Sequence, residues 1–189
     1  MTTVALRLGV AIAMLVSPAA REQTPVARPS SMRVVESIDL GRYAGRWFEI
    51  ARLPNPMQSA CDADVTVRYA LRTDGRLDVI TACRTIAGTL TETRGLGRKL
   101  AQGGSDARLQ LRFVSGVRAL FGAGWTDYWI LGIGPDYTWA VAGSPSRDRL
   151  WILSRTPEMS PSSYEQAEVI ARSNGFDVTR VVKTKQSGQ

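Results

Sequence analysis

The stretch Gly45-Arg46-Trp47-Phe48-Glu49-Ile50-Ala51-Arg52-Leu53 is the first strongly patterned segment of the chain. A glycine ahead of a large aromatic residue allows the backbone to approach its surroundings closely while the indole is buried. The residues that follow are typical of a β-strand. We therefore expect Trp47 to plug one end of a β-barrel. The alternative is an ordinary core tryptophan at the start of a strand.

Short segments with a period of two follow this stretch. Val65, Val67 and Tyr69 alternate with polar or small residues, which predicts one buried and one solvated face. Asp74-Gly75 predicts a hairpin turn. The strands are expected at 47–53, 65–72, 77–83, 89–100, 108–113, 126–133, 139–143 and 150–155. This pattern predicts an all-β fold, an eight-stranded antiparallel up-and-down β-barrel with room for one small ligand.

The pattern changes after the eighth strand. Ser160-Pro161 is typical of a helix N-cap followed by proline at the first helical position. Apolar residues at helical spacing and a terminal Asn174-Gly175 predict one C-terminal helix over 161–173. A last strand is expected at 176–182. We assign 38–184 to a single barrel domain that includes this helix.

The N-terminus resembles an export signal. Arg7 precedes the apolar run Leu8–Val16, and Ala19 and Ala20 offer small residues for cleavage, which predicts a signal peptide over 1–20. Residues 21–37 lack periodicity and are expected to form a flexible leader. The mature protein is thus expected to be exported, periplasmic or secreted, with no cysteine after the apolar run to serve as a lipidation site.

Composition excludes several function classes. The 189-residue chain contains no histidine, which rules out histidine-ligated zinc or haem and histidine-dependent nucleophilic catalysis. The net charge of +7 comes from arginines scattered singly along strands, which is typical of a solvated face rather than a nucleic-acid site. We expect no nucleic-acid partner, no cofactor and no metal.

The chain has two cysteines, Cys61 and Cys83. An even pair in an exported protein favours a disulfide, and two reduced buried thiols are the alternative. In a simple hairpin register, Cys83 would lie closer to Val65 than to Cys61. A bridge therefore requires the chain to bend or bulge before the strand that contains Val65.

Three motifs together resemble those of the lipocalin family, in its bacterial lipocalin and apolipoprotein D branch. They are Gly45-Arg46-Trp47, Pro135-Asp136-Tyr137 and the run from Trp151 to Pro157, which carries Arg155. The resemblance covers residues 39–182. It implies a binding protein for a fatty acid, lysophospholipid or similar hydrophobic molecule, for storage or transport in the cell envelope.

Barrel geometry gives these motifs a common location. The start of the first strand, the turn at 134–137 and the end of the eighth strand return to one end of an up-and-down barrel. We therefore expect a structural cluster of Gly45, Trp47, Asp136, Tyr137 and Arg155, with the guanidinium over the indole. Such a cation–π pair contributes about 1–2 kcal/mol when it is partly desolvated.

Strand alternation then assigns side chains to the barrel interior. The residues expected to face the ligand are Val67, Tyr69, Val79, Thr81, Leu109, Leu111, Phe113, Tyr128, Ile130, Ala140, Ala142 and Trp151. A packed core without a cavity is the alternative, because the same alternation produces it. In the loop 114–125, Val117, Leu120 and Phe121 are expected either to touch a membrane surface transiently or to fold inward as a lid.

Two other function classes remain open at this point. An enzyme on this fold needs an acid, base or nucleophile inside the barrel, and Glu49 is the only plausible strand carboxylate near Trp47. We expect no enzyme activity. A third hypothesis is a protein-binding module that uses the loops at the mouth.

Overall fold

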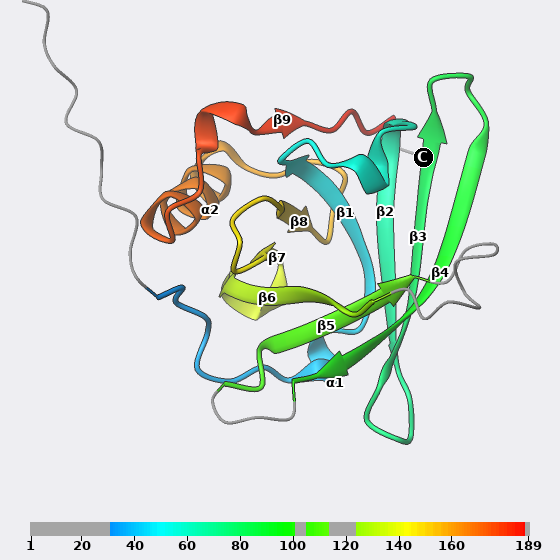
Figure 1. The fold of residues 1–189 in the computed structure, drawn as a ribbon. Helices are drawn as coiled ribbons and strands as arrows, with labels where there is room; N and C mark the ends of the chain where they lie inside the picture. The colour runs from blue at the N-terminus through cyan, green and yellow to red at the C-terminus, as the bar shows by residue number, and fades with distance from the viewer. Residues whose placement is uncertain (1–30, 101–104, 114–123, 188–189) are drawn as a thin grey trace, which may run out of the picture.

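The computed structural model describes residues 31–100, 105–113 and 124–187. Eight antiparallel strands close into a barrel, and one long helix lies against its outside (Figure 1). This confirms the predicted fold class. The elements are α1 (Leu40–Tyr43), β1 (Gly45–Arg52), η1 (Pro56–Gln58), β2 (Cys61–Leu71), β3 (Leu77–Thr85), β4 (Leu90–Lys99), β5 (Arg108–Phe113), β6 (Thr126–Ile133), η3 (Pro135–Tyr137), β7 (Trp139–Gly143), β8 (Leu150–Ser154), α2 (Pro161–Ser173), η4 (Val178–Arg180) and β9 (Val182–Lys183).

Strand β1 closes the barrel by pairing with two partners along its length. Its first half pairs with β2, from Gly45 opposite Tyr69 to Phe48 opposite Thr66. Its second half pairs with β8, up to Arg52 opposite Trp151, after a register shift at 49–51. A shift of this kind bends a strand and increases its twist. Beyond Phe48, β1 therefore leaves β2.

The C-terminal segment fills the gap that opens between β1 and β2. Thr184 N donates to Ile50 O at 2.9 Å, and Asp64 N donates to Lys185 O at 2.8 Å. The Gln186 amide donates to the carbonyls of Glu49 (2.8 Å) and Val65 (3.0 Å). The last described residues thus complete the barrel wall near the mouth.

This arrangement corrects the strand expected over 176–182. Phe176 is instead buried with the helix cluster, residues 178–180 form the short helix η4, and β9 covers only Val182 and Lys183. The apolar residues of 176–181 had suggested a strand. They are explained by packing against α2, which needs no strand periodicity.

Helix α2 covers the outer face of β6, β7 and β8. Ser160 caps it by accepting a hydrogen bond from Ser163 N at 3.2 Å. The buried Ala167 and Ala171 pack with Val141 and Ile152 of the sheet. The barrel strands β7 and β8 are therefore buried on both faces.

The leader is also held more firmly than the sequence predicted. Met32 is buried against the helix cluster, and Val35 N donates to Ile130 O at 3.1 Å. Ile38 N donates to Asp106 Oδ1 at 2.8 Å. From Met32 onward the leader is thus a packed strap rather than a flexible segment. Its apolar residues, Met32, Val34, Val35 and Ile38, do not follow a regular alternation.

One end of the barrel is closed by Trp47, which is fully buried. The Arg155 guanidinium lies 3.7 Å from the centroid of the indole. It donates to the carbonyls of Arg42 (2.6 Å), Tyr43 (3.2 Å), Arg46 (2.9 Å) and Tyr137 (3.2 Å). Helix α1 seals this end, shown at the bottom of Figure 1. Asp136 lies at its exposed edge, 3.4 Å from Arg42.

Gly45 has two reasons to be glycine. Its φ of +98° is unfavourable for other residues, and a Cβ there would lie 3.1 Å from Arg155 Nη1. Gly75 in the β2–β3 turn has a similar φ of +77° but open space around it. An alanine at position 75 therefore adds backbone strain alone, whereas an alanine at position 45 also displaces the guanidinium.

We predict that Gly45→Ala lowers the free energy of unfolding by about 3 kcal/mol, while Gly75→Ala lowers it by about 1 kcal/mol. Urea unfolding of both variants measures the difference. Equal losses of unfolding free energy in the two variants would show that a Cβ at position 45 does not disturb Arg155.

Candidate ligand cavity

A cavity of about 430 Å³ occupies the half of the barrel opposite Arg155. This volume lies within the range of small-molecule sites, about 300–1,000 Å³. The residues that line it are Glu49, Asn55, Met57, Gln58, Ala60, Cys61, Val65, Thr66, Val67, Tyr69, Thr81, Ala82, Cys83, Thr91, Thr93, Leu111, Phe113, Thr126, Asp127, Tyr128, Trp151 and Leu153.

The residues predicted from strand alternation divide into two groups. Those in the cavity lining are Val67, Tyr69, Thr81, Leu111, Phe113, Tyr128 and Trp151. The others, Val79, Leu109, Ile130, Ala140 and Ala142, were expected in the wall but belong to the packed cluster around Trp47. They face inward, but large side chains fill the barrel at their depth. Ligand contact by the first group remains a prediction.

Tyr69 and Tyr128 line the base of the cavity, and Tyr43 packs against both of them. The hydroxyls of Tyr43 and Tyr128 are 2.8 Å apart, and the rings of Tyr43 and Tyr69 are 5.2 Å apart. Burial raises the pKa of Tyr69 and Tyr128 well above the ordinary value of 10.0, and it raises the pKa of Tyr43 as well. The base therefore presents neutral hydroxyls above an aromatic floor.

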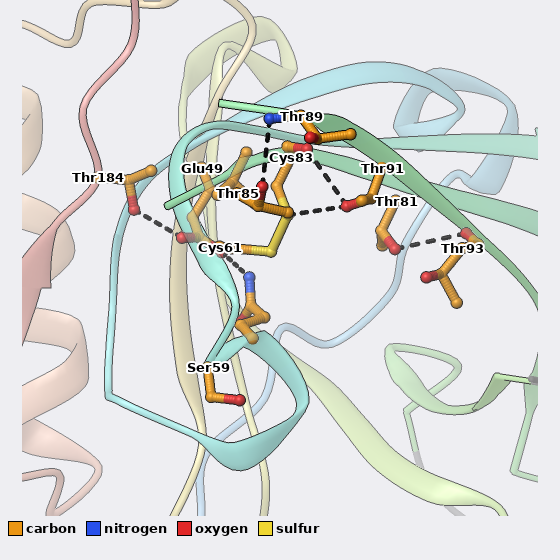
Figure 2. The surroundings of a disulfide bond; sticks show 12 residues. Glu49, Ser59, Cys61, Thr81, Cys83, Thr85, Thr89, Thr91, Thr93 and Thr184 are labelled. Carbon is orange, nitrogen blue, oxygen red and sulfur yellow. Dashed lines mark hydrogen bonds between the residues drawn. A yellow bond between two sulfur atoms is a disulfide. The ribbon is translucent and has the colours of Figure 1, made fainter. Parts of the chain in front are cut away.

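One wall of the cavity is rich in threonine. Thr81 and Cys83 of β3 pair with Thr93 and Thr91 of β4, so their side chains share one face. Thr81 donates to Thr93 O at 3.4 Å, and Thr91 donates to Cys83 O at 3.3 Å. Figure 2 shows these threonines beside the disulfide. The cavity thus combines an aromatic base with a hydroxyl-lined side.

The structure confirms the disulfide between Cys61 and Cys83, whose Cα atoms are 5.6 Å apart. Register shifts in β2 between Cys61 and Thr66 bring Cys61 opposite Thr85. This is the bulge that a bridge required. Both cysteines line the cavity, so the bond joins the start of β2 to the mouth end of β3.

A buried polar cluster lies next to the disulfide, where Arg52 Nη2 donates to Cys61 O at 3.2 Å. Glu49 is only 2% exposed and accepts from Arg52 Nη1 (2.7 Å), Thr184 Oγ1 (2.6 Å) and Gln58 Nε2 (2.6 Å). Gln58 Oε1 in turn accepts from Trp151 Nε1 at 2.9 Å. The carboxylate is paired and hydrogen-bonded, which is the condition for burying a charge. It is therefore a structural anchor rather than a free general base.

Sequence reasoning missed part of this site. Thr91 and Thr93 could have been found, because pairing β4 with β3 places them beside Thr81. Gln58 and Thr184 carried no such signal, since one lies in a loop and the other in the C-terminal segment. Val117, Leu120 and Phe121, the suggested rim, lie outside the described residues.

Within the described ranges, no group of three or more potential metal ligands is present. No helix in the same part of the chain is long and apolar enough to cross a membrane.

Comparison with known proteins gives a consistent result. Residues 38–186 match the model of the Lipocalin-like domain family. Temperature-induced lipocalin-1 of Arabidopsis thaliana is 35% identical, over 82% of this chain and 83% of the relative. Outer membrane lipoprotein Blc of Escherichia coli K12 is 32% identical over 85% and 86%. Apolipoprotein D of Mus musculus is 26% identical over 82% and 80%.

Solved structures show the same fold at lower identity. Insecticyanin from the tobacco hornworm Manduca sexta superposes with a TM-score of 0.63 at 20% identity, covering 86% of this chain and 87% of that one. Lobster apocrustacyanin A1 gives a TM-score of 0.61 at 20% identity, over 78% and 79%.

We predict that Tyr43, Tyr69 and Tyr128, among the five tyrosines of the chain, do not ionise near pH 10. Their folded pKa values lie above the unfolded one, so their contribution to stability is complete below about pH 10 and is lost as the pH rises further. These three tyrosines should therefore add no phenolate absorbance near pH 10, and their absorbance should appear at higher pH together with unfolding. A single smooth titration of all tyrosines in the folded protein would contradict the buried base.

Proposed function

Because the chain belongs to the lipocalin family, we propose that its cavity holds one single-chain lipid, of the class that includes fatty acids and lysophospholipids. The lipid would be stored or transported in the cell envelope. The family supports a small hydrophobic ligand in general terms. The proposal adds the kind of ligand and the place where it is carried.

The single observation that carries the proposal is a cavity closed at the Trp47 end and lined by strands on its sides. Val67, Leu111 and Phe113 offer apolar surface inside it. Each CH₂ group of a chain buried there would contribute about 0.8 kcal/mol before ordering costs. The polar cluster at Glu49 and Gln58 lies near the mouth, where a head group would remain. This division suits an amphiphilic molecule.

Two observations support export to the envelope. The Cys61–Cys83 disulfide is typical of an oxidising compartment. Four bacterial relatives are named outer membrane lipoproteins. This chain is proposed to reach the envelope through its N-terminal signal.

The structure offers less support for an enzyme. Both cysteines are bridged, and the carboxylate of Glu49 is engaged by three donors. An acid, base or nucleophile must be free to exchange a proton or attack. Binding therefore remains the proposed function.

We predict that the protein purified from its exporting host carries lipid, and that Val67→Trp abolishes most of this load by filling the cavity. Arg68→Trp is the matched control, because Arg68 is exposed and neighbours Val67 in β2. Native mass spectrometry measures the bound mass, and the melting temperature verifies the fold of each variant. A wild-type protein that is repeatedly empty, or a folded Val67→Trp variant with an unchanged load, would contradict the proposal.

Export has a separate test. The intact mass of the protein recovered from the envelope or medium should correspond to cleavage after Ala19 or Ala20. A mass that retains residues 1–20 would remove the support for a cleaved signal.

A further inference from the structure

We infer that the cavity selects lipids whose polar group donates hydrogen bonds and carries no negative charge. A monoacylglycerol has this chemistry, whereas an ionised fatty acid does not. The inference rests on the proposed function and narrows it from a broad class of single-chain lipids to one kind of head group.

The charges around the cavity give the first reason. Among the described residues that line it, none is lysine or arginine. The charged lining residues are Glu49 and Asp127. Asp127 lies beside the outward-facing Gln110, whose amide donates to it at 3.1 Å. No described lining residue therefore supplies a positive charge to an entering carboxylate.

Arg52, a cation bonded to the lining residues Glu49 and Cys61, is already engaged. Its guanidinium donates to Glu49 Oε1 at 2.7 Å, Thr184 Oγ1 at 3.1 Å and Cys61 O at 3.2 Å. The side chains of the Arg52–Glu49 pair are only 12% and 3% exposed. Diverting Arg52 to a ligand carboxylate would leave the buried Glu49 without its counter-charge, which is strongly unfavourable.

An unpaired acceptor at the mouth gives the second reason. Asn55 lines the cavity, is only 9% exposed, and its Oδ1 has no hydrogen-bond partner in the described structure. The orientation of its amide is fixed, because Nδ2 donates to Gln58 Oε1 at 2.8 Å and to Leu53 O at 3.3 Å. Buried polar atoms are rarely left unpaired, and a hydroxyl donor on the ligand would satisfy this one.

The neighbouring groups offer both donors and acceptors to a ligand. Gln58 Oε1 already accepts from Asn55 Nδ2 and Trp151 Nε1, whereas Nε2 retains a second N–H beside the one that donates to Glu49. The hydroxyl of Thr93 can both donate and accept, whereas that of Thr91 already donates to Cys83 O and can only accept from a ligand. A ligand hydroxyl can satisfy Asn55 and exchange hydrogen bonds with these threonines. A carboxylate can only accept, so it cannot pair with Asn55 Oδ1, and the negative charge of Glu49 repels it.

The test compares three ligands with the same twelve-carbon chain: 1-monolaurin, methyl laurate and laurate. Each is titrated at pH 8 against an uncharged naphthylamine probe bound to the delipidated protein. We expect monolaurin to displace the probe with at least tenfold higher affinity than laurate. Methyl laurate, which has neither a donor nor a charge, should fall between them. A monolaurin-to-laurate ratio below tenfold would overturn the inference.

A variant designed to gain affinity for laurate provides a second test of the role of charge. Thr93→Lys places a cation on the cavity wall and should raise the affinity for laurate at least tenfold, while the uncharged Thr93→Met should not. If both variants raise it equally, charge is not the selecting factor and the inference is wrong. The melting temperature shows whether each variant is folded, and the wild-type ranking decides the question if one is not.

The outcomes separate the two proposals. Strong laurate binding overturns only the head-group inference and leaves lipid binding intact. A protein that binds neither the probe nor any of the three lipids overturns the proposed function and this inference together.

Discussion

The guanidinium of Arg155 lies 3.7 Å from the centroid of the Trp47 indole and donates to four backbone carbonyls. Those carbonyls belong to α1, the start of β1 and the turn before β7. One side chain near the end of β8 thereby joins segments that lie more than 100 residues apart in sequence. The charge-assisted bonds satisfy carbonyls that strand pairing leaves free at this end. The barrel needs this closed end before its interior can be a cavity.

Because one end of the barrel is closed, side chains fill the half of the interior next to that end. Trp47 and the inward residues of β5, β6 and β7 occupy the lower half, and the tyrosine base separates them from the empty upper half. The mouth is held differently. The Cys61–Cys83 bond fixes β2 to β3, and the segment from Val182 to Ser187 bridges the gap between β1 and β2. The closed end at Trp47 and the cross-linked strands at the mouth together keep the cavity open to a ligand.

Strand periodicity predicted the barrel and showed which side chains of each strand face its interior. Helical spacing predicted the helix. Periodicity could not predict how far along the barrel axis each residue lies. Val67 and Val79 both face the interior, but only Val67 lines the cavity. The bulge needed for the disulfide was predictable from simple register. The cluster of Glu49, Gln58 and Thr184 was not, since it joins a strand, a loop and the C-terminal segment through contacts without a sequence period. The strap at 32–37 and the end of the chain escaped prediction for the same reason.

The most direct test of a closed floor with a lipid above it is a crystal structure of the protein with a monoacylglycerol brominated at the end of its chain. Anomalous scattering locates the bromine without reference to any model of the lipid. The structure presented above predicts a bromine peak in the cavity next to Tyr69 and Tyr128, with the glycerol near Asn55 and Thr91. A bromine on the outer surface, or a cavity that contains only solvent while the lipid is bound elsewhere, would contradict it.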